Sequence, residues 1–244
     1  YIVSMVLLVA VLVPGIGEIR EGSRRWLGLG SLGLQPAELA KITTVLFLAD
    51  RLARKRGTLN FIKDFGPYIV LIGITALLIL KEPDLGTTVI LVGNSILVLF
   101  LAGANVWYLS FLGVLAVPVI YRVVMAEDYM RQRIVAFMDP WQDPMGLGWQ
   151  IIQSLYAFGT GGLFGAGIGM SRQKGFYLPQ ADTDFIFAII GEEMGFFGTF
   201  LVVLLFLVVA WRGYTIAMNA PDRFSCHLAA GLTTGIVAQA AINM

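Results

Sequence analysis

An almost unbroken apolar run extends from Phe185 to Trp211, and only Glu192 and Glu193 interrupt it with charge. A helix needs about 20 apolar residues to cross the hydrocarbon core of a bilayer, so this run is long enough to do so. The chain contains about seven candidate spans, at residues 1–14, 36–50, 67–81, 84–102, 106–124, 184–211 and 227–244. Charged residues make up only 14% of the chain, against about 25% in an average soluble domain. Because lipid-exposed backbone must satisfy its own hydrogen bonds, the sequence predicts an all-α, polytopic membrane helix bundle.

The chain begins and ends inside apolar runs, so we interpret residues 1–244 as a single membrane domain that is a fragment of a longer polytopic protein. Residues 1–14 carry no charged n-region and no small-residue cleavage site, which argues against a signal peptide. The formal net charge is +1 and no long basic run is present, so nucleic acid is not an expected partner. A single cysteine, Cys226, excludes an internal disulfide framework and a cysteine metal cluster.

Five cations in the loop 51–63 mark that loop as cytoplasmic by the positive-inside rule. Alternation then places residues 15–35, 82–84 and 125–183 outside the cytoplasm, and residues 103–105 and 212–226 inside. The outside loop 15–35 nevertheless holds Arg20, Arg24 and Arg25, against the rule. Cations on that side indicate a function there.

The external segment 125–183 is too long for a simple connector, and loops of this length are usually functional. Within it, residues 149–158 alternate between two helical faces. One face holds Gln150, Gln153, Ser154 and Ala157, and the other holds Ile151, Ile152, Leu155 and Phe158. This pattern predicts a helix lying in the membrane interface. The glycine-rich stretch GTGGLFGAGIG (159–169) follows, and it indicates a flexible hinge or a close approach of backbone, since no strand precedes it to favour a nucleotide loop.

Four long motifs resemble the SEDS family, whose members include FtsW and RodA. They are GSRRWLGLGSLGLQPAELAK (22–41), EPDLGTT (82–88), RIVAFMDPWQDPMGLGWQIIQSL (133–155) and GGLFGAGIGMSRQKGFYLPQADTDFIFAIIGEEMGFFG (161–198). The sequences of residues 133–155 and 171–184 are more similar to FtsW and its sporulation relative than to RodA. The resemblance implies a ten-helix glycosyltransferase of the bacterial inner (plasma) membrane that polymerises lipid II into glycan strands at the external face. It also implies contacts with undecaprenyl pyrophosphate-linked glycan and membrane lipids, and a class B penicillin-binding protein transpeptidase as partner.

The family's essential carboxylate lies in a Thr-Asp-Phe motif, which corresponds to Asp184 here. Forming a glycosidic bond requires one base for the acceptor hydroxyl and cations for the leaving pyrophosphate. The resemblance therefore implies that Asp184 is the catalytic base of a single inverting displacement, while the residue type alone also fits a helix N-cap. Where the family commonly has Glu followed by Ala-His, this chain has Gln180, Ala181 and Asp182. We interpret Asp182 as a solvated loop residue.

Six further residues are candidates for substrate binding: Arg25, Glu38, Lys41, Asp84, Arg172 and Lys174. Guanidinium groups suit a pyrophosphate, and Arg25 matches an Arg-Trp pair of the family motif. Each candidate also has a structural alternative. Arg25, Arg172 and Lys174 could anchor lipid headgroups, Glu38 and Lys41 could form an intrahelical pair, and Asp84 could cap a helix.

Glu192 and Glu193 fit structural hydrogen bonding and the shaping of a cavity equally well. Carboxylates in this chain could hold Mg²⁺ or Mn²⁺ beside a pyrophosphate, although no ligand spacing is diagnostic, and no other cofactor is expected. Two rival functions use the same features. One is a lipid II transporter, which would need access from both faces and shows no pair of broken helices in matching halves. The other is a non-catalytic scaffold for the division synthase.

Overall fold

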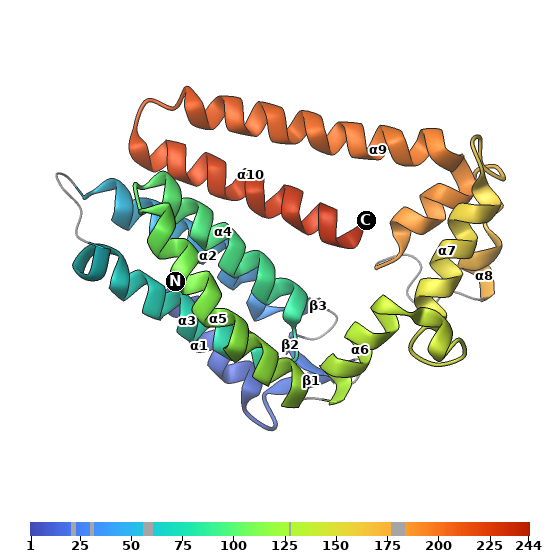
Figure 1. Cartoon of the computed structure of the whole chain (residues 1–244), viewed down its shortest axis with the longest axis horizontal. Coiled ribbons are helices and arrows are strands. Elements are labelled where there is room, and N and C mark those ends of the chain that lie inside the picture. The colour runs from blue at the N-terminus through green and yellow to red at the C-terminus, as the bar shows by residue number, and fades with distance from the viewer. Residues whose placement is uncertain (21–22, 30–31, 56–60, 127, 177–183) are drawn as a thin grey trace. The chain divides into compact units, whose positions relative to one another are not determined.

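The computed structural model describes residues 1–244 apart from 21–22, 30–31, 56–60, 127 and 177–183. The chain divides into two compact units (Figure 1). The first contains Tyr1–Val114 and Ala210–Gln239, and the second contains Leu115–Val209 and Ala240–Met244. The single membrane domain expected over residues 1–244 stays a prediction.

The apolar runs form helices, as the sequence predicts. They are α1 (Ile2–Leu12), α2 (Pro36–Ala53), α3 (Gly66–Leu80), α4 (Leu85–Leu101), α5 (Val106–Ala126), α9 (Ile186–Met218) and α10 (Arg223–Asn243). Within the described ranges, three helical stretches are long and apolar enough to cross a membrane: Lys63–Leu80, Ile186–Met218 and Arg223–Asn243. The first of these includes part of a short π-helix, η1 (Phe61–Phe65), which leads into α3. The chain is therefore a polytopic helical membrane protein.

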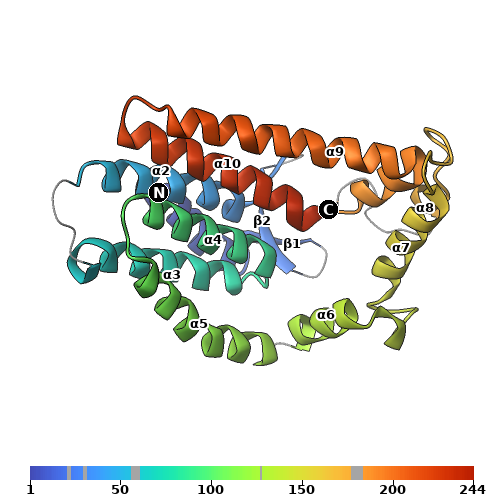
Figure 2. The same ribbon diagram turned by 45° about the horizontal axis from the view of Figure 1, so that its top comes forward.

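The core of the first unit lies where α2, α3 and α4 pack side by side (Figures 1 and 2). Leu48 and Val45 of α2 and Val98 of α4 are buried there. Helix α10 packs against α2 and α4 at Gly231. A Cβ atom at that position would lie 2.5 Å from Val45 Cγ1 and 3.0 Å from Val98 Cγ2, so only glycine allows this approach. Small residues at such contacts let helix backbones approach closely, which is how helices associate in lipid.

In addition to the predicted helices, a small antiparallel sheet occupies most of the loop expected at residues 15–35. Strands β1 (Gly17–Arg20), β2 (Ser23–Leu29) and β3 (Leu32–Leu34) pair in the order β1-β2-β3, with a bulge between Glu18 and Ile19. Trp26 pairs with Glu18 and Arg24 pairs with Ile19, so Arg25 is the extra residue of the bulge in β2, and a bulge re-aims the side chain that it carries. The sheet therefore sets the direction of the cation that the sequence singled out.

The external segment expected at 125–183 contains several helices of the second unit. They are α6 (Asp128–Met138), the short 3₁₀-helix η2 (Pro140–Gln142), α7 (Trp149–Gly161) and α8 (Arg172–Phe176). The helix expected at residues 149–158 is present as α7, and its place in the membrane interface stays a prediction. The side of α7 that packs inside the protein is not its apolar side alone. Gln153 and Ala157 are buried with Ile152, while Leu155 is 51% exposed. The small and polar side of α7 therefore packs inside the protein, and part of its apolar side is free to meet lipid.

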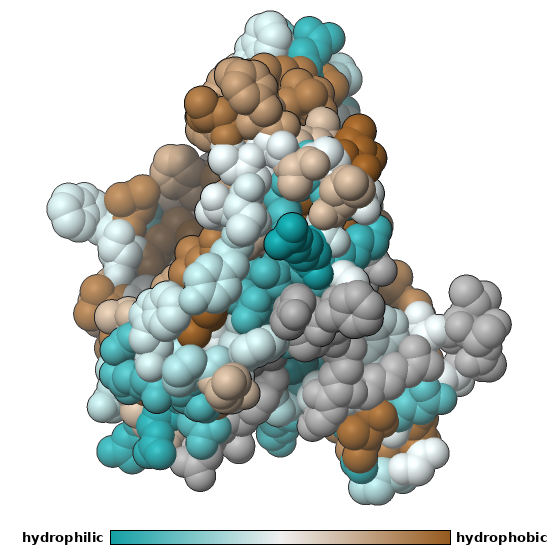
Figure 3. Space-filling model, turned by 90° about the vertical axis from the view of Figure 1, so that its right-hand side faces the viewer, coloured by the Kyte–Doolittle hydropathy of each residue, from teal (hydrophilic) through white to brown (hydrophobic). Residues whose placement is uncertain are grey.

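Helix α9 is broken near its beginning, at Gly195, whose φ of 66° and ψ of −160° are not helical. Beyond the break, Phe196, Phe197 and Phe200 are each more than half exposed. Figure 3 shows apolar side chains gathered along the upper part of the molecule, where α9 lies. Exposed phenylalanines at this density are expected of a helix surface that faces lipid.

The glycine-rich stretch 159–169 packs against α9 at the break. Glycines are needed there because the backbone of this stretch lies directly against the backbone of α9. The N–H groups of Ala166 and Gly167 donate to the carbonyls of Glu192 and Glu193, at 2.8 and 3.1 Å. A Cβ atom on Gly165 would lie 2.1 Å from the carbonyl oxygen of Glu193, and the φ of Gly165 is +82°. Of the two readings of this stretch, the close approach of backbone is the one the structure shows.

Candidate functional site

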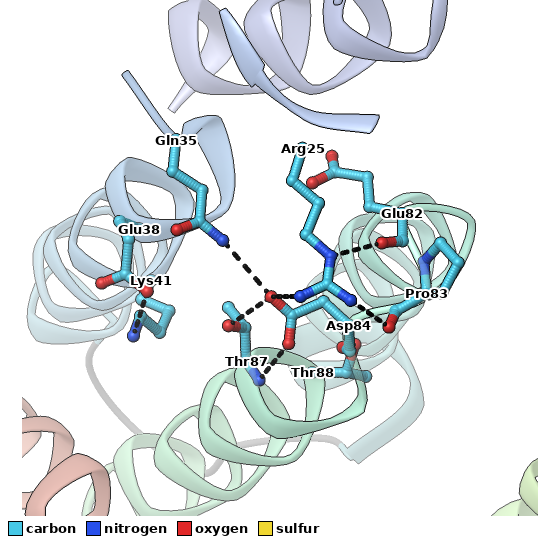
Figure 4. A network of polar contacts seen from close by, with 9 residues as sticks. All are labelled: Arg25, Gln35, Glu38, Lys41, Glu82, Pro83, Asp84, Thr87 and Thr88. Atoms are coloured by element: carbon cyan, nitrogen blue, oxygen red, sulfur yellow. Dashed lines mark hydrogen bonds and ion pairs between the residues drawn. The ribbon is translucent and has the colours of Figure 1, made fainter. Parts of the chain in front are cut away.

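In the first unit, Arg25 of β2 reaches across to the turn between α3 and α4 (Figure 4). Its Nε donates to the carbonyl of Glu82 at 2.9 Å, and its Nη2 donates to the carbonyl of Pro83 at 2.8 Å. Its Nη1 lies 3.9 Å from Oδ2 of Asp84. The guanidinium, which the sequence suggested for a pyrophosphate, is thus engaged with the backbone and carboxylate of this turn.

Asp84 caps α4, which is the structural alternative foreseen for it. Its Oδ1 accepts from the N–H of Thr87 at 3.0 Å, and its Oδ2 accepts from the Thr87 hydroxyl at 2.9 Å. Gln35 Nε2, just before α2, donates to the same Oδ2 at 3.3 Å. A carboxylate at a helix N-terminus satisfies orphan N–H groups and interacts favourably with the helix dipole. Asp84 therefore joins α4, β2 and the beginning of α2.

Glu82 lies in the same turn and is fully buried. Among the described residues, neither of its side-chain oxygens has a hydrogen-bond partner. The pKa of Glu82 is raised to about 8, mainly by burial and also by the negative charge of Asp84, while Arg25 opposes both effects. Glu82 therefore carries its proton at neutral pH, beside a guanidinium and a carboxylate. Glu82 is not among the site residues predicted from the sequence, although a glutamate next to a proline between two apolar spans is a visible signal.

Lys41 and Glu38 lie on one face of α2, as their spacing predicts. Lys41 Nζ lies 2.9 Å from Glu38 Oε1, and it also donates to Oε1 of Gln239 on α10. The Lys41 side chain is only 11% exposed, whereas that of Glu38 is 48% exposed. The intrahelical pair is thus present, and Gln239, which the sequence analysis did not single out, adds a contact between helices.

In the second unit, Asp184 is exposed and lies two residues before Ile186, where α9 begins. Phe185, directly after it, accepts hydrogen bonds from the N–H groups of Ala188 and Ile189 through its carbonyl. The carboxylate is therefore presented at the mouth of the helix, free for contact with another molecule. Asp182 lies outside the described residues.

Arg172 and Lys174 belong to α8, and both side chains are exposed. The backbone N–H of Arg172 donates to Glu192 Oε1 at 3.1 Å, which ties α8 to α9. Of the predicted site residues, the structure groups Arg25 with Asp84 and Glu38 with Lys41. Asp184, Arg172 and Lys174 fall in the second unit. Across the described ranges, no group of three or more His, Cys, Asp or Glu side chains is arranged to hold a metal ion.

Comparison with known proteins matches the whole chain to one family. A sequence model of the FtsW, RodA and SpoVE family, described as "Cell cycle protein", matches residues 1–244. Stage V sporulation protein E of Bacillus subtilis is 45% identical over 244 residues, which are 100% of this chain and 67% of that protein. The probable peptidoglycan glycosyltransferase FtsW of Geobacter metallireducens is 42% identical over 241 residues, covering 98% of this chain and 64% of the relative. The chain spans about two thirds of the length of these relatives.

Solved structures share the fold. A chain in the structure described as "Structural coordination of polymerization and crosslinking by a peptidoglycan synthase complex" has a TM-score of 0.74 and 27% identity, over 99% of this chain and 67% of that one. The rod shape determining protein RodA of Thermus thermophilus has a TM-score of 0.64 and 25% identity, over 97% of this chain and 60% of that one.

Proposed function

Because this chain belongs to the FtsW, RodA and SpoVE family of cell cycle proteins, we propose that it is a lipid II-dependent peptidoglycan glycosyltransferase of the bacterial plasma membrane. The observation that carries the proposal is the match of nearly the whole chain to FtsW relatives named probable peptidoglycan glycosyltransferases. The polytopic helical fold agrees with a lipid-linked substrate, which arrives within the bilayer. The proposed reaction lengthens glycan strands at the external face of the membrane during cell division.

Asp184 is the proposed general base. Its carboxylate takes the proton from the acceptor sugar hydroxyl as the hydroxyl oxygen attacks the anomeric carbon of the donor. The bond between that carbon and the lipid pyrophosphate breaks, and the pyrophosphate leaves with the bonding electron pair. One displacement inverts the anomeric carbon, so no covalent intermediate on the protein is required. The exposure of Asp184 at the beginning of α9 leaves it accessible to such an acceptor.

The cations neutralise the charge that develops on the leaving pyrophosphate. Arg172 and Lys174 have exposed side chains, and Lys41 keeps its ammonium group beside Glu38 and Gln239. Glu38 and Gln239 then serve to orient Lys41 toward substrate.

Arg25 contributes through Asp84 rather than by a free guanidinium. Two of its nitrogens donate to the carbonyls of Glu82 and Pro83, which fixes the turn that precedes α4. The third lies near Asp84 and completes the charge balance around that carboxylate. Arg25 and Asp84 are therefore proposed to act on the substrate as one rigid pair.

A lipid II transporter is the second candidate, and the break at Gly195 is the observation that favours it, because transporters often bind substrates at discontinuous helices. Two features weigh against it. The break is filled by the main chain of Ala166 and Gly167. In the first unit, Gly231 packs closely against Val45 and Val98, which leaves an apolar contact between α2, α4 and α10. An alternating pathway would have to open such contacts.

The deciding experiment is polymerisation of lipid II in detergent by the complete protein and two variants. Asp184→Asn keeps the size of the side chain and removes the base, so it should abolish polymerisation while the protein stays folded. Asp182→Asn should retain activity. A transporter or a scaffold would form no glycosidic bond in this assay, and an active Asp184→Asn variant beside an inactive Asp182→Asn variant would move the base to Asp182.

A crosslinking enzyme is the proposed protein partner, specifically a class B penicillin-binding protein. The structural relative comes from a complex described as coordinating polymerization and crosslinking, which supports this pairing. Co-purification of the complete protein with such a transpeptidase, and stimulation of lipid II polymerisation by it, would test the pairing.

A further inference from the structure

Glu192 is a buried carboxylate on α9 that binds the beginning of another helix. Its side chain is 2% exposed. Oε2 accepts from the Ser171 hydroxyl at 2.5 Å and from the N–H of Gln173 at 3.3 Å, and Oε1 accepts from the N–H of Arg172 at 3.1 Å. Three donors from three consecutive residues thus converge on one side chain, which lies 19 to 21 residues away in sequence.

This contact decides where α8 lies, because α8 has only five residues. So short a helix is not stable on its own in water and depends on tertiary contacts for its position. The first N–H groups of any helix also lack intrahelical partners, and here Glu192 supplies acceptors for those of Arg172 and Gln173. Ser171 completes the arrangement, since its hydroxyl oxygen accepts from the N–H of Lys174 at 3.1 Å.

The backbone of the same turn of α9 holds the segment that leads to α8. The break at Gly195 frees the carbonyls of Glu192 and Glu193, which accept from Ala166 and Gly167. In the other direction, the N–H of Phe196 donates to the carbonyl of Gly162 at 2.9 Å. The approach to α8 is therefore fixed to α9 before Glu192 binds α8 itself.

The same short helical stretch, from Ile186 to the break, begins two residues after Asp184. Glu192 lies six residues into this stretch, and Asp184 stands two residues before the stretch begins. The position of α8 relative to Asp184 consequently depends on the Glu192 side chain. Arg172 and Lys174 use their backbone N–H groups within this arrangement and keep their side chains exposed.

We propose that Glu192 is a positioning residue, which holds α8 so that Arg172 and Lys174 present their charges to the pyrophosphate of a lipid-linked donor in register with Asp184. This inference rests on the proposed glycosyltransferase function. Glu192 acts through α8 and does not touch the substrate. Its carboxylate is needed because both oxygens must accept, and an amide in its place offers one acceptor and one donor.

The first test measures position without activity. Hydrogen–deuterium exchange of the backbone amides of Arg172 and Gln173 is compared in the complete wild-type protein, Glu192→Gln and Glu193→Gln. Glu193 is a matched control, since it is the adjacent glutamate and its Oε1 has no partner among the described residues. Exchange at the two amides should accelerate at least tenfold in Glu192→Gln only. Equal exchange in all three proteins would overturn the positioning role.

The second test measures the consequence for substrate. In lipid II polymerisation, Glu192→Gln should raise KM roughly tenfold while kcat changes less, because removing one charge-assisted contact network is worth about one decade in affinity. Ser171→Ala, which removes a single donor, should shift KM in the same direction by less. In a background carrying Arg172→Ala and Lys174→Ala, the same Glu192→Gln substitution should leave KM nearly unchanged.

The outcomes separate the two proposals. A wild-type protein that makes no polymer overturns the glycosyltransferase function and the pyrophosphate role of α8, and the exchange measurement still decides whether Glu192 positions that helix. An active wild type whose KM is unaltered by Glu192→Gln overturns the positioning role alone. An equal rise in KM with and without Arg172 and Lys174 would show that Glu192 acts through the general fold instead.

Discussion

Replacement of Glu82 by glutamine should stabilise the protein above neutral pH and remove part of its pH dependence. Glu82 is fully buried in the turn before α4, and its carboxyl oxygens have no partner among the described residues. Glu82→Gln mimics the protonated acid in shape and charge. It also keeps the backbone carbonyl that accepts from Arg25. The substitution therefore isolates the cost of ionising this one side chain.

The size of the effect follows from the pKa of Glu82, which is raised from 4.5 to about 8. The folded protein keeps this proton at pH values where the unfolded chain has released it. Stability is therefore greatest below about pH 4.5, falls as the pH rises, and levels off above about pH 8. Each pKa unit is worth about 1.4 kcal/mol, so ionisation costs on the order of 3 kcal/mol of the free energy of unfolding at pH 7 and about 5 kcal/mol above pH 8.

The assay is thermal unfolding of the complete protein in detergent, from pH 4.5 to pH 9. Wild type and Glu82→Gln should melt together at the acidic end, and the variant should melt several degrees higher at the alkaline end. Asp50→Asn, which removes a carboxylate from the solvent-exposed pair with Arg54, controls for the loss of one charge. Parallel curves for wild type and Glu82→Gln across the whole range would refute the assignment of a buried, protonated Glu82.

Three further expectations can be tested on the complete protein. Arg25→Ala should reduce lipid II polymerisation more than Arg24→Ala, because it removes two hydrogen bonds to backbone carbonyls and the cation beside Asp84. Each charge-assisted hydrogen bond is worth about 1.5–3 kcal/mol. Equal and slight effects of the two substitutions would favour headgroup anchoring. A cysteine at Lys55 should resist an impermeant thiol reagent applied outside the cell, whereas one at Gln142 should react, and the reverse pattern would overturn the orientation. Gly165→Ala should lower the free energy of unfolding by roughly 2 kcal/mol or more, as judged by thermal melting, because its Cβ would collide with a carbonyl at positive φ; an unchanged melting temperature would contradict the packing of this loop.

The helical spans could be predicted from the sequence because their signals are local. The apolar run 184–211 corresponds to the larger part of α9, and Pro36 stands at the first position of α2, where its missing N–H is harmless. Asp84 was recognisable as a cap for the same reason, since the residue type and the helix it caps are adjacent in sequence. In each case the physics is contained within one or two turns of chain.

The sheet, the break and the buried acid could not be predicted in this way. The partner of Arg25 is a turn more than fifty residues away, and the carbonyls it binds carry no side-chain signature. Gly195 is one of several glycines in its region, and only the approach of residues 162–167 makes its conformation stable. Glu82 stands next to a proline between two apolar spans, but its burial is known only from the structure. Contacts made by backbone groups leave little trace in the identity of the residues that make them.

The break in α9 provides hydrogen-bond acceptors for the neighbouring loop. An uninterrupted helix satisfies its own carbonyls and offers nothing for a neighbouring loop to bind in lipid, where an unpaired carbonyl costs several kcal/mol. At Gly195 the helix releases the carbonyls of Glu192 and Glu193, and the N–H groups of Ala166 and Gly167 compensate that loss. The helix thereby gains a fixed attachment point for the loop that carries α8.

This attachment requires glycine at the close main-chain contacts, whereas other side chains of the loop are exposed. At Gly161 a Cβ atom would lie 1.9 Å from the carbonyl oxygen of Gly191, so any larger residue would displace the loop from the helix. Phe164 and Ile168, by contrast, are 80% and 82% exposed, and their side chains take no part in the main-chain contacts. The position of the loop is therefore set by its glycines, and among its exposed side chains Phe164 adds a ring contact with Phe197 of α9. The main-chain contacts of this loop therefore hold the chain that leads to α8 against α9.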